Sequence, residues 1–187
     1  MKSCALCQGR FPATDLNRIS GLDFCSTCSL YEPEGELPSV GITVARKHSR
    51  IRSEHGVWYE VMLTMHGASP DLKRLSWSFK REFLFQRVRN QVFGELKVGD
   101  PLFDRLVSIE KMPPDDLALL SENEGLQSAI LSMVSSMEES TNVVEIRSGQ
   151  VKWSFNRRLP YTPEEWRMAQ FESLALGIHL HRLFERG

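Results

Sequence analysis

All four cysteines of this 187-residue chain lie within its first 28 residues, as two C-x2-C pairs. Cys4 and Cys7 form the first pair, seventeen residues follow, and Cys25 and Cys28 form the second pair. This spacing is typical of four-cysteine zinc modules. Two residues between cysteines allow a tight turn that directs both sulfurs to one centre, and two such turns complete a tetrahedral thiolate shell. The pattern therefore predicts a Zn²⁺ site with these four cysteines as ligands.

Two other interpretations of the four cysteines stay open: a redox or disulfide pair, and an iron–sulfur or catalytic metal site. A reducing cytoplasm disfavours two permanent disulfides. Four thiolate ligands leave a zinc ion no open position for water, which weighs against a catalytic metal. A segment of this size cannot build much of an apolar core, so we expect metal binding and folding of the finger to be one event.

The residues between the cysteine pairs predict a β-hairpin. Residues 16–19 and 22–25 are typical of short strands, and Ser20-Gly21 between them suits a tight turn. The segment resembles the zinc-ribbon and treble-clef fingers at the start of many bacterial proteins, through Cys-x-x-Cys-x-Gly-x-Phe-Pro at 4–12 and Asp-Phe-Cys-Ser-Thr-Cys at 23–28. The resemblance implies a knuckle held by metal. It implies no particular partner, because such fingers bind proteins, nucleic acids or nothing.

Composition and apolar patterning indicate that the chain folds and in which cell compartment it is expected. Apolar residues make up 41% of the chain, charged residues 25%, and the net charge is −1. This balance argues against wholesale electrostatic binding to nucleic acid or to a membrane. The apolar runs fall far short of the roughly 18 residues that a membrane-spanning helix needs, and the N-terminus lacks the apolar stretch of a signal peptide. We therefore expect a cytoplasmic protein with no membrane partner.

The chain changes character after the finger. Residues 31–38, YEPEGELP, are acidic and contain two prolines and a glycine, which is typical of a linker. We predict a zinc-binding finger at 1–30, a linker at 31–39 and an α+β domain at 40–187. The expected fold class is α+β, in which an antiparallel sheet carries two or three helices and the last helix is C-terminal.

Apolar alternation and helical stripes predict the elements of that domain. The expected strands are one that starts at 42–44, then 58–65, 75–80, 106–109 and a hairpin of 144–147 with 150–155. The expected helices are 81–93, a short turn capped by Asp115 or Asp116, 124–137, and a terminal helix that ends near Glu185. The last helix has the clearest start, since Thr162 suits the N-cap, Pro163 the first helical position, and Glu165 a capping box.

The sequence Gly-Asp-Pro-Leu-Phe-Asp at 99–104 precedes one of these predicted strands. Together with the helix, hairpin and terminal helix that follow, it resembles an uncharacterised bacterial domain marked by a GDP-x-FD motif, over residues 75–187. The resemblance implies no activity. The residues themselves favour a turn, in which Asp100 accepts hydrogen bonds from backbone N–H groups and Phe103 enters the core. The alternative, Asp100 and Asp104 as a metal-binding or general-base pair, lacks a nearby histidine or third acid.

The histidines and common catalytic motifs give no support for an enzyme. His179 and His181 lie two apart on the last helix and cannot share one metal ion. His48, His55 and His66 lie in expected loops or strand ends, without an HExxH order. The chain also has no Walker loop, no GxGxxG and no GxSxG. An enzyme whose residues converge only in three dimensions stays as the third possibility for its function.

Charge is distributed unevenly along the chain. Residues 46–89 contain ten basic residues against four acidic ones, a net charge of +6, whereas residues 90–145 have a net charge of −8. The basic residues form a candidate surface for nucleic acid or an acidic protein partner, and ordinary solvated strand faces are the other interpretation. They are Arg46, Lys47, Arg50, Arg52, Lys73, Arg74, Lys80, Arg81, Arg87 and Arg89.

Three classes of function follow. The first is a non-enzymatic, zinc-binding, cytoplasmic protein that acts as a protein-interaction module, as an adaptor, a regulator or an immunity-type protein. The second is a nucleic-acid-binding regulator that uses the finger and the basic stretch 46–89. The third is the enzyme described above. We expect a protein partner, with nucleic acid as the alternative, and Zn²⁺ as the cofactor.

Overall fold

The structure is a computed structural model that describes residues 1–7, 9–30, 35–37, 42–53, 56–66, 68–81, 96–135, 142–157 and 162–185. Within these residues it contains one large sheet, two small hairpin sheets and six α-helices. The predicted helix 81–93 lies outside the described residues except for Arg81, which ends a strand. The end of the predicted helix 124–137 also lies outside them.

Seven strands form the large sheet, and every neighbouring pair is antiparallel. In sheet order they are β5 (Gly35–Leu37), β6 (Ile42–Ser53), β7 (Gly56–His66), β11 (Gln150–Arg157), β10 (Asn142–Arg147), β8 (Ser76–Arg81) and β9 (Val107–Lys111). The apolar and polar residues that alternate in the sequence of a strand also alternate between buried and more exposed positions. Along β7, Tyr59, Val61 and Leu63 are buried and the residues between them are half-exposed. The expected antiparallel sheet is confirmed.

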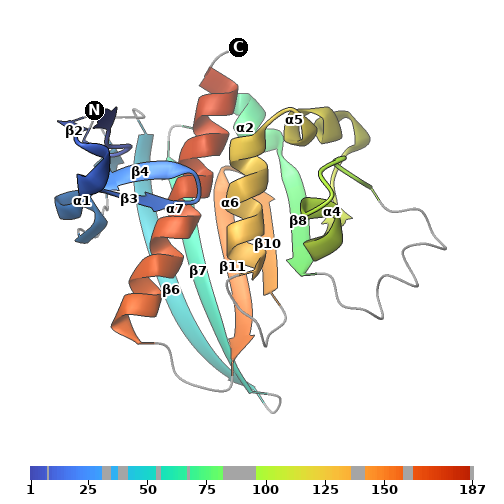
Figure 1. Cartoon of the computed structure of the whole chain (residues 1–187). Coiled ribbons are helices and arrows are strands. Elements are labelled where there is room, and N and C mark those ends of the chain that lie inside the picture. Colours follow the sequence, from blue (N-terminus) through green and yellow to red (C-terminus); the bar gives the residue numbers. More distant parts are fainter. Residues whose placement is uncertain are drawn as a thin grey trace.

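Two long helices, α6 (Glu124–Ser135) and α7 (Pro163–Glu185), lie side by side across one face of the sheet (Figure 1). The predicted capping box starts α7: the Thr162 N–H donates to Glu165 Oε2 at 2.8 Å, and the Glu165 N–H donates to Thr162 Oγ1 at 3.2 Å. The described part of the chain after the finger also contains three short helices, α2 (Pro70–Arg74), α4 (Phe103–Leu106) and α5 (Leu117–Ser121). The α+β class, with its last helix at the C-terminal end, is confirmed.

The core lies between the two long helices and the sheet face that they cover. The side chains of Trp77, Phe79 and Trp153 are no more than 2% exposed. One buried polar chain crosses this core: Trp153 Nε1 donates to Asn142 Oδ1 at 3.0 Å, and Asn142 Nδ2 donates to the Val134 carbonyl at 3.1 Å. Because these buried polar groups have partners, the helix end and the two strands are held in one register.

Helix α7 approaches β7 closely at one glycine. A Cβ atom added at Gly177 would lie 2.5 Å from Leu63 Cδ2 and 3.3 Å from Met65 Sδ. A side chain there would require Leu63 and Met65 to move. The glycine therefore allows these two side chains to pack directly against the helix backbone.

Two predicted local features are wrong. Leu106 was expected to start a strand, but it ends α4, and the strand begins at Val107. The reason is the preceding turn, which continues as one turn of helix before the chain extends. Asp116 was a candidate helix cap, but it makes no capping bond to α5. Its Oδ2 instead accepts a hydrogen bond from Trp77 Nε1 at 2.7 Å, because the indole N–H of a buried tryptophan needs an acceptor.

Strand β6 starts at Ile42, as predicted from residues 42–44. It runs to Ser53 and pairs with β7 from Thr43↔His66 to Ser53↔Gly56. His48, expected in a loop or at a strand end, lies in the middle of this strand. Gly35–Leu37, from the predicted linker, forms β5 and pairs with the first three residues of β6. The division into finger, linker and domain stays a prediction.

Candidate metal centre

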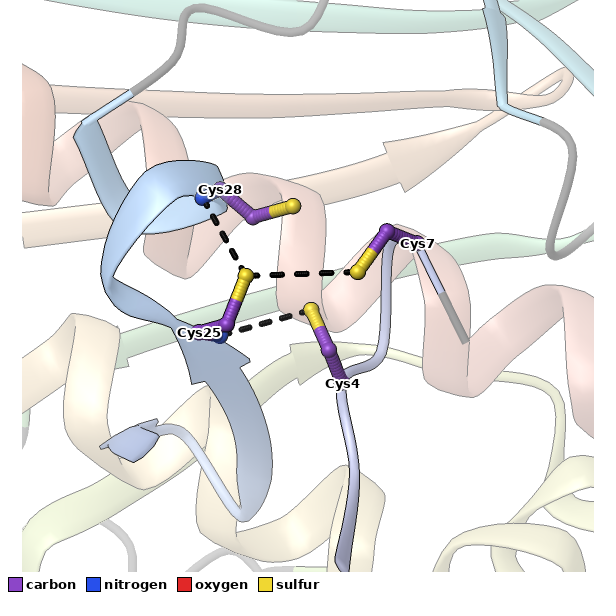
Figure 2. Close-up of side chains that lie close together, drawn as sticks. All are labelled: Cys4, Cys7, Cys25 and Cys28. Atoms are coloured by element: carbon purple, nitrogen blue, oxygen red, sulfur yellow. Dashed lines mark hydrogen bonds between the residues drawn. The ribbon is translucent and has the colours of Figure 1, made fainter. Parts of the chain in front are cut away.

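The four cysteine sulfurs converge on one point, and each lies within 4.8 Å of the others. Cys4 and Cys7 lie on the turn between β1 (Lys2–Ser3) and β2 (Arg10–Phe11). Cys25 ends β4 (Leu22–Cys25), and Cys28 lies in α1 (Ser26–Leu30). Figure 2 shows the four side chains pointing toward one another from these two knuckles. The predicted cluster of four ligands is present as a group that can hold a metal ion.

A β-hairpin brings the two knuckles together. Strand β3 (Leu16–Ile19), which follows a 3-10 turn at Ala13–Asp15, pairs with β4 from Leu16↔Cys25 to Ile19↔Leu22. Ser20 and Gly21 turn the chain with φ of 47° and 80°, the left-handed values that a tight hairpin requires. The predicted hairpin is confirmed at both strands. It returns the chain so that the second cysteine pair lies beside the first.

Backbone hydrogen bonds fix the first knuckle against β4. The Cys4 N–H donates to the Gly9 carbonyl at 2.9 Å, and the Ala5 N–H donates to the Asp23 carbonyl at 2.7 Å. Lys2 Nζ also lies 3.4 Å from Asp23 Oδ2. These contacts keep the Cys4 side of the cluster close to Cys25.

The polar surroundings of the sulfurs favour a bound cation. Burial raises the pKa of the Cys4 thiol, but backbone N–H donors outweigh it and lower that pKa to about 7. One of these donors is the Cys25 N–H, 3.4 Å from Cys4 Sγ. Burial, and then the neighbouring sulfurs, raises the pKa of Cys28. A thiolate set in which like charges oppose one another is stabilised by a central metal ion.

Four sulfur ligands in this arrangement suit a limited set of metals. Thiolates are soft ligands, and a tetrahedral set of four selects zinc or an iron–sulfur centre over magnesium or calcium. All four cysteines are free thiols rather than disulfides. In the part of the chain that the structure describes, this is the one group of three or more Cys, His, Asp or Glu side chains with metal-ligand spacing. The cluster therefore has the ligands and the spacing to hold such a metal ion.

The finger packs against the last helix of the sheet domain (Figure 1). The buried Phe24 ring of β4 meets the Phe171 ring of α7 edge to face, with 5.4 Å between centroids. At the hairpin turn, His179 Nε2 lies 3.0 Å from the Ser20 carbonyl oxygen and donates to it. Ile19 and Leu22 are also buried in the core that includes α7. The metal cluster is thus attached to the domain through the hairpin.

Sequence reasoning missed the role of His179. The residue was considered only as a metal ligand, and its bond to Ser20 joins positions 159 apart in the chain. Burial lowers the pKa of His179. Its ring also lies against the start of α6, since a Cβ added at Gly125 would be 2.7 Å from His179 Cε1. The one available signal was a polar residue within an otherwise apolar helix segment.

The basic residues predicted as one surface lie on separate elements. Arg46, Lys47, Arg50 and Arg52 belong to β6, Lys73 and Arg74 to α2, and Lys80 and Arg81 to β8, while Arg87 and Arg89 lie outside the described residues. Strands β7, β11 and β10 separate β6 from β8. Arg74 also pairs with Asp71 on its own helix. The basic residues of β6 and those of β8 are therefore separated by three strands of the sheet.

The GDP-x-FD segment forms the predicted turn. Asp100 Oδ1 accepts from the Phe103 N–H at 2.7 Å, and the Phe103 side chain is 1% exposed. Both carboxylate oxygens of Asp104 accept backbone N–H groups, from Val98 at 2.9 Å and Gly99 at 3.0 Å. Gly99 has φ of 94°, which a side chain would strain. Both aspartates are thus occupied in closing the turn.

One acidic residue is buried between the two long helices. The Glu172 side chain on α7 accepts a hydrogen bond from Ser132 Oγ on α6 at 2.9 Å. Burial raises the pKa of Glu172 to about 7, although the hydrogen bond from Ser132 lowers it in part. The carboxyl group therefore carries a proton for part of the time near neutral pH.

Comparisons with protein-family models, with curated proteins and with solved structures found no match for this chain. The resemblance of residues 75–187 to the GDP-x-FD domain therefore stays a prediction. Among the described residues, none of the helices has the length and apolar character needed to cross a membrane.

Proposed function

We propose that Cys4, Cys7, Cys25 and Cys28 bind one structural Zn²⁺ ion, and that the protein is a non-enzymatic protein-interaction module built around this finger. The observation that carries the proposal is the set of four sulfurs within 4.8 Å of one another. Four thiolates fill the tetrahedral shell that zinc prefers and leave no position for water or substrate. The ion would hold the two knuckles together rather than act on a bound molecule.

The attachment of the finger to α7 supports a module that presents a fixed surface. Phe24 is buried against Phe171, and His179 binds the hairpin turn. A finger held in this way would present the same exposed residues, such as Cys7 and Arg18, in every copy of the protein. A pre-organised surface loses less entropy on binding a partner. Roles as an adaptor, a regulator or an immunity-type protein in the cytoplasm all use such a surface.

A nucleic-acid-binding regulator is the second possibility that the sequence leaves. Its support is the net positive charge of the stretch 46–89. However, β6 and β8, which carry parts of that charge, are separated by three strands in the sheet. We therefore favour a protein partner. A gel shift with DNA and RNA at low salt separates the two, since retardation that salt abolishes would favour nucleic acid.

Metal content tests the zinc proposal. Protein purified under reducing conditions should contain one equivalent of zinc by elemental analysis. Cobalt in place of zinc should give the absorption bands of a tetrahedral thiolate site. Cys4→Ser should lower the zinc content below half an equivalent, whereas Thr27→Ala, an exposed neighbour in the second knuckle, should leave it unchanged. Wild-type protein that contains iron instead, or less than half an equivalent of zinc, would contradict the proposal.

Affinity capture from the native cell tests the interaction proposal. Deleting the finger would expose Phe171 and create a new apolar surface, so point variants are the better probes. Exposed finger residues changed singly, such as Arg18→Glu, should reduce capture of specific proteins while zinc content stays at one equivalent. Capture that is identical for wild-type protein and for all exposed-finger variants would restrict the finger to a structural role.

A further inference from the structure

The four cysteines of the cluster differ in their access to solvent. Cys4 and Cys25 are buried, at 1% and 3% exposure, and Cys28 is half-buried. Cys7 is exposed. A cysteine that binds a metal ion does so as a thiolate, and the oxidation of thiolates follows their exposure. Among four bound thiolates, exposure therefore decides which one an oxidant reaches first, and it selects Cys7.

The local sequence adds no side chain against the Cys7 sulfur on one side. Gly9 lies next to this sulfur, since a Cβ atom built on Gly9 would be 3.4 Å from Cys7 Sγ. The same Cβ atom would lie 2.7 Å from Cε2 of the Phe11 ring. Any residue other than glycine would therefore contact the sulfur and displace the ring. The glycine of C-x-x-C-x-G thus leaves this approach to the sulfur uncovered.

A second sulfur faces Cys7 from the other knuckle. Cys7 Sγ and Cys25 Sγ are 3.9 Å apart, and Figure 2 shows this contact as a dashed line between the two side chains. The sulfurs of a disulfide are about 2.0 Å apart, so closure of a bond between them needs a displacement of about 2 Å. Because Cys7 is exposed and lies on a turn, its side chain is the one placed to make that movement.

We infer that Cys7 is a site of oxidation by a hydroperoxide such as hydrogen peroxide, and that Cys25 then closes a Cys7–Cys25 disulfide, so that the finger releases its zinc ion. The inference rests on the proposed zinc site and adds a way to regulate it. The reaction takes place at sulfur, so it needs no open position on the metal ion. It joins by a covalent bond the same two knuckles that the ion would join.

The reaction has two steps. The Cys7 thiolate attacks one oxygen of hydrogen peroxide: an S–O bond forms, the O–O bond breaks, and hydroxide leaves a sulfenic acid on Cys7. The Cys25 thiolate then attacks the Cys7 sulfur: the S–S bond forms, the S–O bond breaks, and a second hydroxide leaves. Two thiolates thus give two electrons to one peroxide. Cys4 and Cys28 remain, which are half of the four ligands that zinc requires.

Zinc release from the full-length, zinc-loaded protein tests the inference. Elemental analysis first establishes one equivalent of zinc in the untreated protein. Hydrogen peroxide should then release that zinc to a chromogenic chelator, and a thiol reductant with added zinc should restore the original content. A sample without peroxide, kept with the same chelator for the same time, measures spontaneous loss and should release at least about tenfold less.

Peptide mapping identifies the bond. Arg10 and Arg18 lie between the two cysteine pairs, so trypsin separates the pairs. A Cys7–Cys25 disulfide should therefore link two tryptic peptides, and fragmentation of the linked product should assign both cysteines. The competing product, a disulfide between Cys4 and Cys7, would stay within one peptide. Dimedone added with the peroxide should label Cys7 at least about tenfold more than any other cysteine.

Two histidine variants locate the reactive sulfur. Cys7→His keeps a zinc ligand at this position but removes the thiolate, and its release of zinc by peroxide should be at least about tenfold slower than in wild type. Cys28→His makes the same exchange in the other knuckle and keeps the reacting pair, so it should release zinc at least about tenfold faster than Cys7→His. If either variant does not retain zinc, the peptide map of the wild-type protein still decides.

The contrary results are distinct. A disulfide between Cys4 and Cys7, or equal release from the two histidine variants, would overturn the inference. Zinc-loaded protein that keeps its zinc in excess peroxide would overturn the inference alone and leave the zinc proposal in place. Untreated protein that contains no zinc would contradict the zinc proposal itself.

Discussion

The finger and the sheet domain are stabilised in different ways. In the domain, a wide sheet and two long helices bury large side chains such as Trp77, Phe79 and Trp153. The finger buries few apolar side chains, chiefly Ile19, Leu22 and Phe24, and these contribute to the domain's core as well. Its other buried residues are Ala5, Leu6, Cys4 and Cys25. With zinc bound as proposed, the finger would depend on the metal ion and on its neighbour, whereas the domain depends on apolar packing.

Removal of the metal ion should produce the largest difference in folding between the finger and the sheet domain. Chelation of the reduced protein, or Cys4→Ser, should unfold residues 1–30, because thiolate–zinc binding provides about 10–16 kcal/mol in small zinc fingers. The sheet domain should stay folded. Hydrogen exchange measured by mass spectrometry should show loss of protection in the finger and retained protection in β10 and β11. Simultaneous loss of protection in both regions would mean that they form one cooperative unit.

A core truncation in the domain should give the reverse pattern. Phe79 is fully buried and packs edge to face on Trp77 and Phe103. Phe79→Ala should lower the free energy of unfolding of the domain by about 3–5 kcal/mol. Zinc content below the melting temperature should stay at one equivalent, because no sulfur ligand is touched. Urea denaturation followed by tryptophan fluorescence measures the first quantity, and loss of zinc from folded variant protein would contradict the second.

The buried carboxyl group of Glu172 should make the domain, rather than the finger, sensitive to pH. Its pKa is about 7 in the folded protein and 4.5 in the unfolded reference. The folded state holds the proton more tightly, so stability falls as pH rises from 4.5 to about 7. Glu172→Gln should remove this loss and be more stable than wild type by about 2 kcal/mol at pH 8.

The difference between wild type and Glu172→Gln isolates this effect. His179, on the same helix, has a lowered pKa. The stability that it contributes is therefore lost as pH falls, which is the opposite direction to the effect of Glu172. Because both proteins contain His179, its contribution cancels in the difference. Denaturant titrations at pH 5 and pH 8 should show the advantage of the variant only at the higher pH. An equal advantage at both values would mean that the carboxyl group is not protonated in the folded state.

The smallest effect is expected where the two regions meet. His179→Ala removes the hydrogen bond to the Ser20 carbonyl and should weaken docking of the hairpin by about 1 kcal/mol. His179→Gln retains a side-chain N–H and is the matched control. Hydrogen exchange of residues 16–25 in the zinc-loaded protein should increase in the alanine variant. No increase would show that Phe24 and Phe171 hold the finger without help from the histidine.

Local patterns predicted most of the elements. The hairpin 16–25, the start of α7 and the turn at Asp100 each depend on residues within a few positions of one another, and each was found as expected. Predictions failed where a distant residue decides. Asp116 binds Trp77 rather than capping α5, and no local pattern identifies that indole as its partner. The sequence predicted only the start of β6, and the extent of the strand follows its pairing with β7.

By itself the sequence determined the four sulfur ligands, the α+β class and the position of the last helix. Ligand spacing, apolar period and capping residues act over a few neighbouring positions, so the primary structure contains them in full. Only the tertiary structure decided that the finger rests on α7, that the described basic residues divide among β6, α2 and β8, and that β6 pairs with β7 as far as Ser53. These features join residues far apart in the chain, and packing chooses among many pairings that local residues allow equally.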